Sequence, residues 1–214
     1  MTRHLPTEER RAQILAAARA CFLEAGYHAT RVQQIARAAG LSKGAVYFHF
    51  ENKRALLEAL VEDEFARAQG IFDEAERSPV PLAAMAQAFL GFLGQPGDPR
   101  HRFFVLTGEL AVEDEDLRRR LRGHHEGLLA RMAGVFERFA EVAGQPLADP
   151  LATAVLVKAM ADGLQGAFAM GFEFDRSRLL MAALGLLQSG LLGAGAGAAP
   201  LGPALAATQG QESG

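Results

Sequence analysis

Between residues 30 and 52 the chain carries helix start and stop signals at unusually short intervals. Thr30 and Gln33 can form a capping box, in which a hydroxyl and an amide side chain satisfy free backbone donors at a helix start. Gly40 then stands where a helix ends in a left-handed conformation, and Ser42 can cap another helix at once. The spacing predicts two short helices joined by a tight turn.

Amphipathic helices are expected on both sides of this pair. Apolar residues recur on one face from residue 7 to residue 25, and Gly26 ends the pattern. A long pattern begins after Asn52 and ends at Ser78, which precedes a proline. Ala and Leu run through the later segments, while runs rich in β-branched residues are missing, so we predict an all-α fold. Further helices are expected at about 81–94, 100–112, 115–143, 150–171 and 176–193.

Charge is divided unevenly between the two ends of the chain. Residues 1–55 carry nine Lys/Arg and four Asp/Glu, whereas the rest carries thirteen and twenty-one. The basic end is therefore the candidate for contact with nucleic-acid phosphates. The patterns predict a three-helix, helix-turn-helix domain at 1–52, a larger helical domain at 53–193 with a connecting helix at 53–78, and a flexible Gly/Ala-rich tail at 194–214.

The second helix of the short pair has the small, basic start that a DNA-reading helix needs. Such a helix enters the major groove N-terminus first, so its first residues must be small or able to contact phosphates and base edges. Gly44 costs about 1 kcal/mol relative to Ala inside a helix, and close approach of DNA would explain its presence. Packing for Tyr47 and His49, and solvated charge for Lys43 and Lys53, are the alternatives. The residues expected to contact DNA are Thr30, Arg31, Ser42, Lys43, Gly44, Ala45, Tyr47, His49 and Lys53.

Residues 26–30 (GYHAT) and 35–53 (IARAAGLSKGAVYFHFENK) resemble the DNA-binding domain of the TetR family of repressors. The resemblance implies a homodimer that binds double-stranded operator DNA of pseudo-palindromic sequence. It also implies that a small effector, bound by the larger domain, controls the spacing of two DNA-reading heads. Phe48 stands where family members often carry Tyr, so a hydroxyl contact with phosphate from that position is missing.

The last two expected helices each carry an apolar seam with alternating spacings of three and four residues. Two seams on adjacent helices suit a four-helix dimer interface about a two-fold axis, although each seam can instead face its own core. The residues predicted for this interface are Ala154, Val157, Ala161, Leu164, Phe168, Leu180, Leu184, Leu187 and Leu191.

Aromatic and Met side chains gather in the middle of the larger domain, beside isolated polar groups. A few polar groups in an apolar helical domain would orient a lipophilic effector such as an acyl-CoA or an aromatic compound, although such stripes often pack only as core. The residues predicted for this cavity are Phe89, Phe92, Phe104, Thr107, Glu109, Met132, Phe136, Gln165 and Phe168.

Other classes of protein find less support in the sequence. His124 and His125 point about 100° apart on a helix and do not share a metal without further ligands. No catalytic dyad, phosphate loop or Ser elbow is found, so we expect no enzyme and no cofactor. A helical protein adaptor would not need the basic recognition pattern. A single Cys, a polar N-terminus and the interruptions in the apolar stretch 179–207 indicate a cytoplasmic protein without a membrane span.

Overall fold

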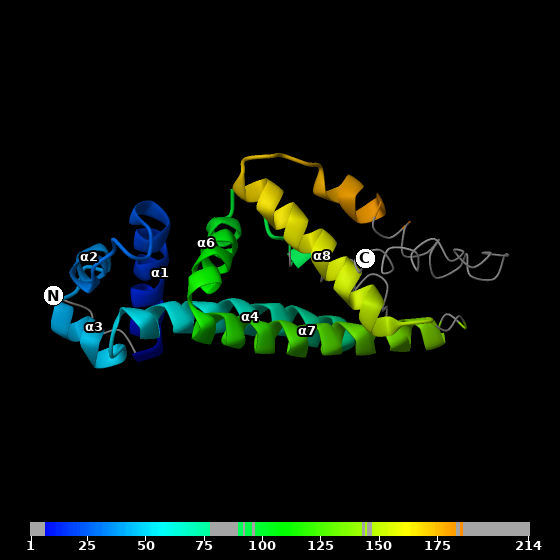
Figure 1. The fold of residues 1–214 in the computed structure, drawn as a ribbon, viewed down its shortest axis with the longest axis horizontal. Helices are drawn as coiled ribbons and strands as arrows, with labels where there is room; N and C mark the ends of the chain where they lie inside the picture. The colour runs from blue at the N-terminus through cyan, green and yellow to red at the C-terminus, as the bar shows by residue number, and fades with distance from the viewer. Residues whose placement is uncertain are drawn as a thin grey trace, which may run out of the picture.

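All regular structure in the described part of the chain is helical, which confirms the predicted all-α class (Figure 1). The expected helix at 81–94 lies largely outside that part, and the tail at 194–214 lies wholly outside it. Residues 176–182 of the last expected helix are helical. The computed structural model describes residues 7–77, 90–91, 93–95, 97–142, 144, 147–182 and 185 of the 214-residue chain.

The predicted pair of short helices lies at one end of the molecule. Ser42 caps the second of them, because its Oγ accepts a hydrogen bond from the Ala45 N–H at 3.1 Å. Gly40 has a φ of 65°, which favours glycine and allows the tight turn. Both helices pack with the preceding one around a buried core that includes Ile14 and Val46. The three helices of this head (Figure 1) are α1 (Thr7–Ala25), α2 (Val32–Ala38) and α3 (Lys43–His49).

The start of α2 differs from the predicted capping box by one residue. Gln34 Oε1 accepts a hydrogen bond from the Arg31 N–H at 2.7 Å, so the cap begins at Arg31 rather than at Thr30. The Thr30 side chain is buried, and its Oγ lies 2.7 Å from the carbonyl oxygen of Gly26 and 3.0 Å from that of Cys21. The hydroxyl therefore connects the end of α1 to the segment before α2.

Two long helices run side by side through the rest of the molecule (Figure 1): α4 (Lys53–Arg77) and α7 (Glu115–Val142). α6 (Pro99–Glu113) contacts α1, α7 and α8 (Pro150–Ala169). An aspartate before a proline caps the start of α6 and of α8: Asp98 accepts a hydrogen bond from the Arg100 N–H, and Asp149 accepts one from the Ala152 N–H. None of the described helices combines the length and apolar character needed to cross a membrane.

The core of the head continues into α6. Phe103 and Ala111 of α6, with Leu117 at the start of α7, belong to the same buried cluster as Ile14 and Phe22 of α1. Closely packed side chains transmit displacement because the interior leaves little free volume. A movement of α6 therefore acts directly on the packing of the head.

Candidate nucleic-acid interface and cavity

α3 presents its first residues and one side to solvent. Lys43, Gly44 and Tyr47 are exposed, as is the capping Ser42, whereas Val46 faces the core. The Lys43 Nζ lies over the Tyr47 ring, 5.5 Å from its centre. A Cβ added at Gly44 would find only the Ser42 Oγ within 4 Å, at 3.9 Å. The start of α3 is thus open, basic and sterically small, as a helix that approaches DNA requires.

The apolar side chain of Phe48 on α3 is unusually exposed. Phe48 is 82% exposed, the highest value among the large apolar side chains that the structure describes. Its ring packs edge-on against His49, 5.2 Å away between centres. His49 and Ala45 are only half-buried, so both keep part of their surface toward solvent. The exposed ring extends the same surface and can make apolar contacts with sugar or thymine methyl groups.

Lys53 does not extend into solvent as a phosphate ligand would. Its Nζ donates hydrogen bonds to the backbone carbonyls of Tyr27 at 2.6 Å, His28 at 3.0 Å and Thr30 at 2.9 Å. An ammonium group has three protons, so these three bonds use all of its donors. This conformation therefore does not favour the predicted phosphate contacts of Lys53 and of the buried Thr30. Both residues instead hold the loop that precedes α2.

Replacing Lys53 by Met should lower the free energy of unfolding by about 2 kcal/mol, because hydrogen bonds from a charged donor to the loop would be lost. Methionine keeps an unbranched apolar stem of similar length. Chemical denaturation of the protein without DNA measures the change. The matched control is Lys43→Met on the exposed start of α3, which should stay within about 0.5 kcal/mol of the wild type. Equal stability of the two variants would contradict the role of Lys53 in the loop.

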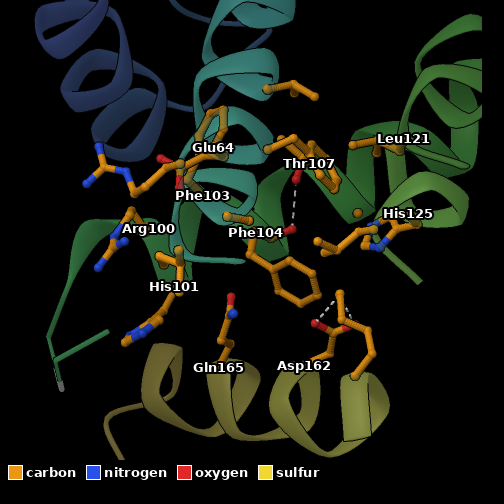
Figure 2. Close-up of a pocket in the computed structure, with 18 of the residues that line it drawn as sticks. Glu64, Arg100, His101, Phe103, Phe104, Thr107, Leu121, His125, Asp162 and Gln165 are labelled. Carbon is orange, nitrogen blue, oxygen red and sulfur yellow. Dashed lines mark hydrogen bonds and ion pairs between the residues drawn. The ribbon is translucent and has the colours of Figure 1, made fainter. Parts of the chain in front are cut away.

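A cavity of about 270 Å³ lies among α4, α6, α7 and α8 (Figure 2). Much of its wall is apolar and includes Phe65, Phe104 and Leu128. Figure 2 shows Gln165 and Asp162 extending from α8 toward Phe104. A concave, mostly apolar site with a few polar groups is typical of small-molecule binding.

The structure brings some of the predicted cavity residues together and separates others. Phe104, Thr107 and Gln165 line the cavity. Glu109 is exposed on α6, so its predicted role is wrong for this cavity. The reason is helical geometry: Glu109 follows Thr107 by two residues, about 200° around the helix, and points the other way.

Three other predicted cavity residues belong to the packed core. Met132 and Phe136 lie in the buried cluster between α4, α7 and α8, and Phe168 lies in a second cluster on α8. None of the three lines this cavity, so their prediction is also wrong for it. Phe89 and Phe92 lie outside the described residues.

An ion pair between the buried Lys158 and the half-buried Asp162 of α8 lines the cavity. The Lys158 Nζ donates hydrogen bonds to both carboxylate oxygens of Asp162, at 2.5 and 2.6 Å. Burial lowers the pKa of Lys158 and raises that of Asp162. Sequence reasoning missed both residues. Their spacing of four residues could have indicated the pair, because it places the two charged residues of an otherwise uncharged helix next to each other on one face.

His125 of α7 also lines the cavity, and its pKa is lowered to about 4, first by burial and then by the charges of Lys158 and His124. The unfolded chain takes up a proton near pH 6.5, whereas the folded protein does so only near pH 4. The unfolded state therefore binds more protons in this window. Folding stability is complete above pH 6.5 and falls as the pH drops toward 4.

His125→Gln should reduce the loss of stability between pH 7.5 and pH 4.5 by about 1–2 kcal/mol, after allowance for the partial solvent exposure of the ring. Denaturation curves at both pH values measure the loss. His28→Gln, in the exposed loop after α1, is the control and should leave the pH dependence as in the wild type. A pH dependence unchanged by His125→Gln would contradict this assignment.

Two cavity-lining side chains also contact the head. Glu64 of α4 forms an ion pair with Arg19 of α1, and the Arg19 guanidinium lies 5.1 Å from the centre of the Phe103 ring. Next to Phe103 on α6, Arg102 donates a hydrogen bond to the carbonyl oxygen of Leu23 at 2.8 Å. The walls of the cavity are thus joined directly to α1.

The predicted dimer seam on α8 is its inner face. Ala154, Val157, Ala161 and Phe168 are buried within the chain itself, and Leu164 is half-buried. The four buried residues are not available to a partner while they pack in their own core, whereas the place of Leu164 in an interface stays a prediction. In the following helix Leu180 is half-buried, and the remaining predicted positions, Leu184, Leu187 and Leu191, lie outside the described residues.

The opposite face of α8 is apolar and exposed. It carries Leu151, Val155, Leu156 and Met160, of which Leu156 is 66% exposed. We call these four residues the outer α8 face. Contiguous exposed apolar surface on a globular protein is typical of an interaction site.

These features define a helix-turn-helix protein whose second helical part encloses a cavity. A family model described as bacterial regulatory proteins, tetR family, matches residues 14–60. The regulator TtgR of Pseudomonas putida is 38% identical over 89 residues, which are 39% of this chain and 40% of that protein. A Rhodococcus sp. chain described as a TetR-family transcriptional regulator superposes with a TM-score of 0.70 at 25% identity, covering 86% of this chain and 100% of that one. FadR from Bacillus subtilis, solved in complex with stearoyl-CoA, has a TM-score of 0.67 at 22% identity, with coverage of 84% and 98%.

Residues 14–60 thus match the DNA-binding domain of the TetR family of bacterial regulatory proteins, and the fold of the chain resembles that of a solved TetR-family transcriptional regulator. The sequence match to curated relatives is partial, since the chain spans between 33% and 40% of the length of three of them. In the part of the chain that the structure describes, no group of three or more His, Cys, Asp or Glu side chains is arranged to hold a metal ion.

Proposed function

We propose that the protein is a homodimeric repressor that binds a pseudo-palindromic operator and releases it when a small lipophilic effector enters the cavity. The observation that carries this proposal is the double role of Glu64 and Phe103, which line the cavity and also contact Arg19 of the head. The match of residues 14–60 to the family model supports the DNA-binding part. The similar FadR structure, which holds stearoyl-CoA, supports a lipophilic ligand.

DNA contact is assigned to the exposed start of α3. Lys43, Gly44 and Tyr47 face the major groove and its edges, together with Ser42 and the partly exposed Ala45. Contacts to phosphate fall to other residues at the surface of the head, namely Arg31 and His49.

Dimerisation is assigned to the outer α8 face. A two-fold interface uses the same patch on both copies, and a dimer core is usually richer in apolar surface than the rest of the protein. The exposed Leu151, Val155, Leu156 and Met160 meet this requirement, whereas the inner side of the same helix is already packed.

Release follows from a difference in effector affinity between two arrangements of the cavity walls. A ligand shifts the protein toward the arrangement that it binds better, by no more than that difference in affinity. Two heads on one operator must meet half-sites about 34 Å apart, or a multiple of it. Displacement of α1 by the cavity walls changes this separation and weakens binding to DNA.

Arg19→Met tests this link. The variant should still bind operator and effector, but the effector should change its operator affinity about fivefold less than in the wild type, because one connection between cavity and head is lost. A thermal-shift screen of acyl-CoAs and aromatic compounds supplies the effector, and fluorescence anisotropy with labelled operator gives the affinities. Arg122→Met, on the exposed side of α7, is the control. A wild-type response in Arg19→Met would rule out this route, and the absence of any ligand that alters operator affinity would overturn the proposed function.

A further inference from the structure

The ion pair in the cavity is asymmetric. The Lys158 side chain is 7% exposed, whereas that of Asp162 is 27% exposed. The two residues lie one turn apart on α8, so their contact does not hold different parts of the fold together. Asp162 can turn toward solvent, while Lys158 stays among the cavity walls, where another carboxylate can take the place of Asp162.

Two other charged pairs at the cavity connect helices or cap one, whereas Arg67, which pairs with Asp63 on α4, is 52% exposed. Glu64 pairs with Arg19 of α1, and Arg100 binds Asp98, which caps α6. Breaking either pair would loosen an interhelical contact or a helix start. Exchange of the Asp162 carboxylate has no such consequence, so this pair is the one best suited to open for a ligand.

The surroundings of Lys158 and the shape of the cavity favour an anion with an apolar body. Of the cations that line the described part of the cavity, Arg67 and Arg100 pair with Asp63 and Asp98, and Lys158 is the most deeply buried. The Phe104 ring lies 5.9 Å from the Lys158 Nζ, which places apolar surface beside the ammonium. A volume of about 270 Å³ suits a compact molecule.

We infer that the cavity binds a compact aromatic or aliphatic carboxylic acid, whose carboxylate replaces Asp162 as the counter-ion of Lys158. This inference rests on the proposed function only in placing the effector in the same cavity. No bond forms or breaks: one charge-assisted hydrogen-bonded pair is exchanged for another, and Asp162 moves toward solvent. The buried ammonium stays neutralised throughout.

Three probes of similar shape and different charge test the inference with the full-length protein in the absence of DNA. They are 4-butylbenzoate, the neutral 4-butylbenzamide and the cationic 4-butylbenzylamine. In calorimetric titration the benzoate should bind about tenfold or more tightly than the benzamide, because hydrogen bonds to a charged partner are the stronger ones. Equal affinities, tighter binding of the amine, or no binding of any probe would overturn the inference.

Two variants give opposite expected effects. Lys158→Met should reduce the affinity for the benzoate to that for the benzamide. Asp162→Asn should raise the affinity for the benzoate, because the competing carboxylate is gone, and the benzoate should raise the melting temperature of this variant more than that of the wild type. Unchanged or weaker benzoate binding in Asp162→Asn would overturn the exchange. If one variant fails to fold, the comparison of the probes on the wild type and on the other variant still tests the inference.

Operator affinity measured with the same probes separates this inference from the proposed function. If the benzoate binds as expected but leaves operator affinity unchanged, the inference holds and release by a cavity ligand fails. If a different ligand releases the operator while benzoate and benzamide bind equally, the function holds and the inference fails.

Discussion

Lys43→Ala should lower the affinity for the operator about tenfold or more, because the side chain stands at the first position of the recognition helix and points to solvent. Its ammonium lies over the Tyr47 ring, which holds the charge near the proposed DNA surface. Fluorescence anisotropy across a salt series measures the change, with operator fragments selected from the source genome. If Lys43 contacts phosphate, the slope against salt concentration also falls by about one unit per half-site.

Arg122→Ala is the control for the loss of one positive charge. Arg122 is exposed on α7, away from the head, and its removal changes the net charge by the same amount. Steering by net charge alone would make the two variants lose affinity equally, and that result would contradict a contact from Lys43.

Leu156→Glu should convert the proposed dimer to monomers and lower operator affinity about 100-fold, because two linked heads gain from simultaneous binding and one head does not. Leu156 is 66% exposed in the outer α8 face, so the substitution should leave the fold of the monomer intact. A carboxylate in the centre of an apolar interface has no partner and carries a large desolvation cost. Light scattering gives the mass, and circular dichroism shows whether the helices persist.

Val112→Glu is the matched control, an apolar-to-acidic change at a site on α6 that is 75% exposed and outside the outer α8 face. This variant should remain dimeric. A dimer of unchanged mass in Leu156→Glu would show that the subunits meet through another surface.

Local chemistry allowed much of the head to be predicted. Ser42 and Asn52 bind the N–H groups of the helices that they precede, and Gly40 adopts the left-handed conformation that the turn requires. Each of these features depends on residues within a few positions, so the sequence alone specifies them. The one-residue error at Thr30 arose because its hydroxyl finds carbonyl partners at the end of α1.

Features that depend on tertiary packing could not be predicted in the same way. Apolar residues occur around most of α8, so the spacing of Ala154 and Val157 predicts a seam but does not indicate whether the core or a partner covers it. The structure resolves this by placing both residues inside and Leu156 outside. Lys53 is a similar case, since its three carbonyl partners lie 23 to 26 positions earlier and nothing in their side chains signals the contact.

The three hydrogen bonds of Lys53 also connect the first turn of α4 rigidly to the loop before α2. α4 has 25 residues and is therefore about 37 Å long, which makes it a lever arm with the head at one end. A pivot of about 5° at its far end displaces the head by about 3 Å, a distance comparable to the length of one hydrogen bond. A flexible connection at Lys53 would absorb such a rotation, whereas the three hydrogen bonds would pass it on to α3. In the proposed mechanism, small adjustments around the cavity would then take the start of α3 out of register with the groove.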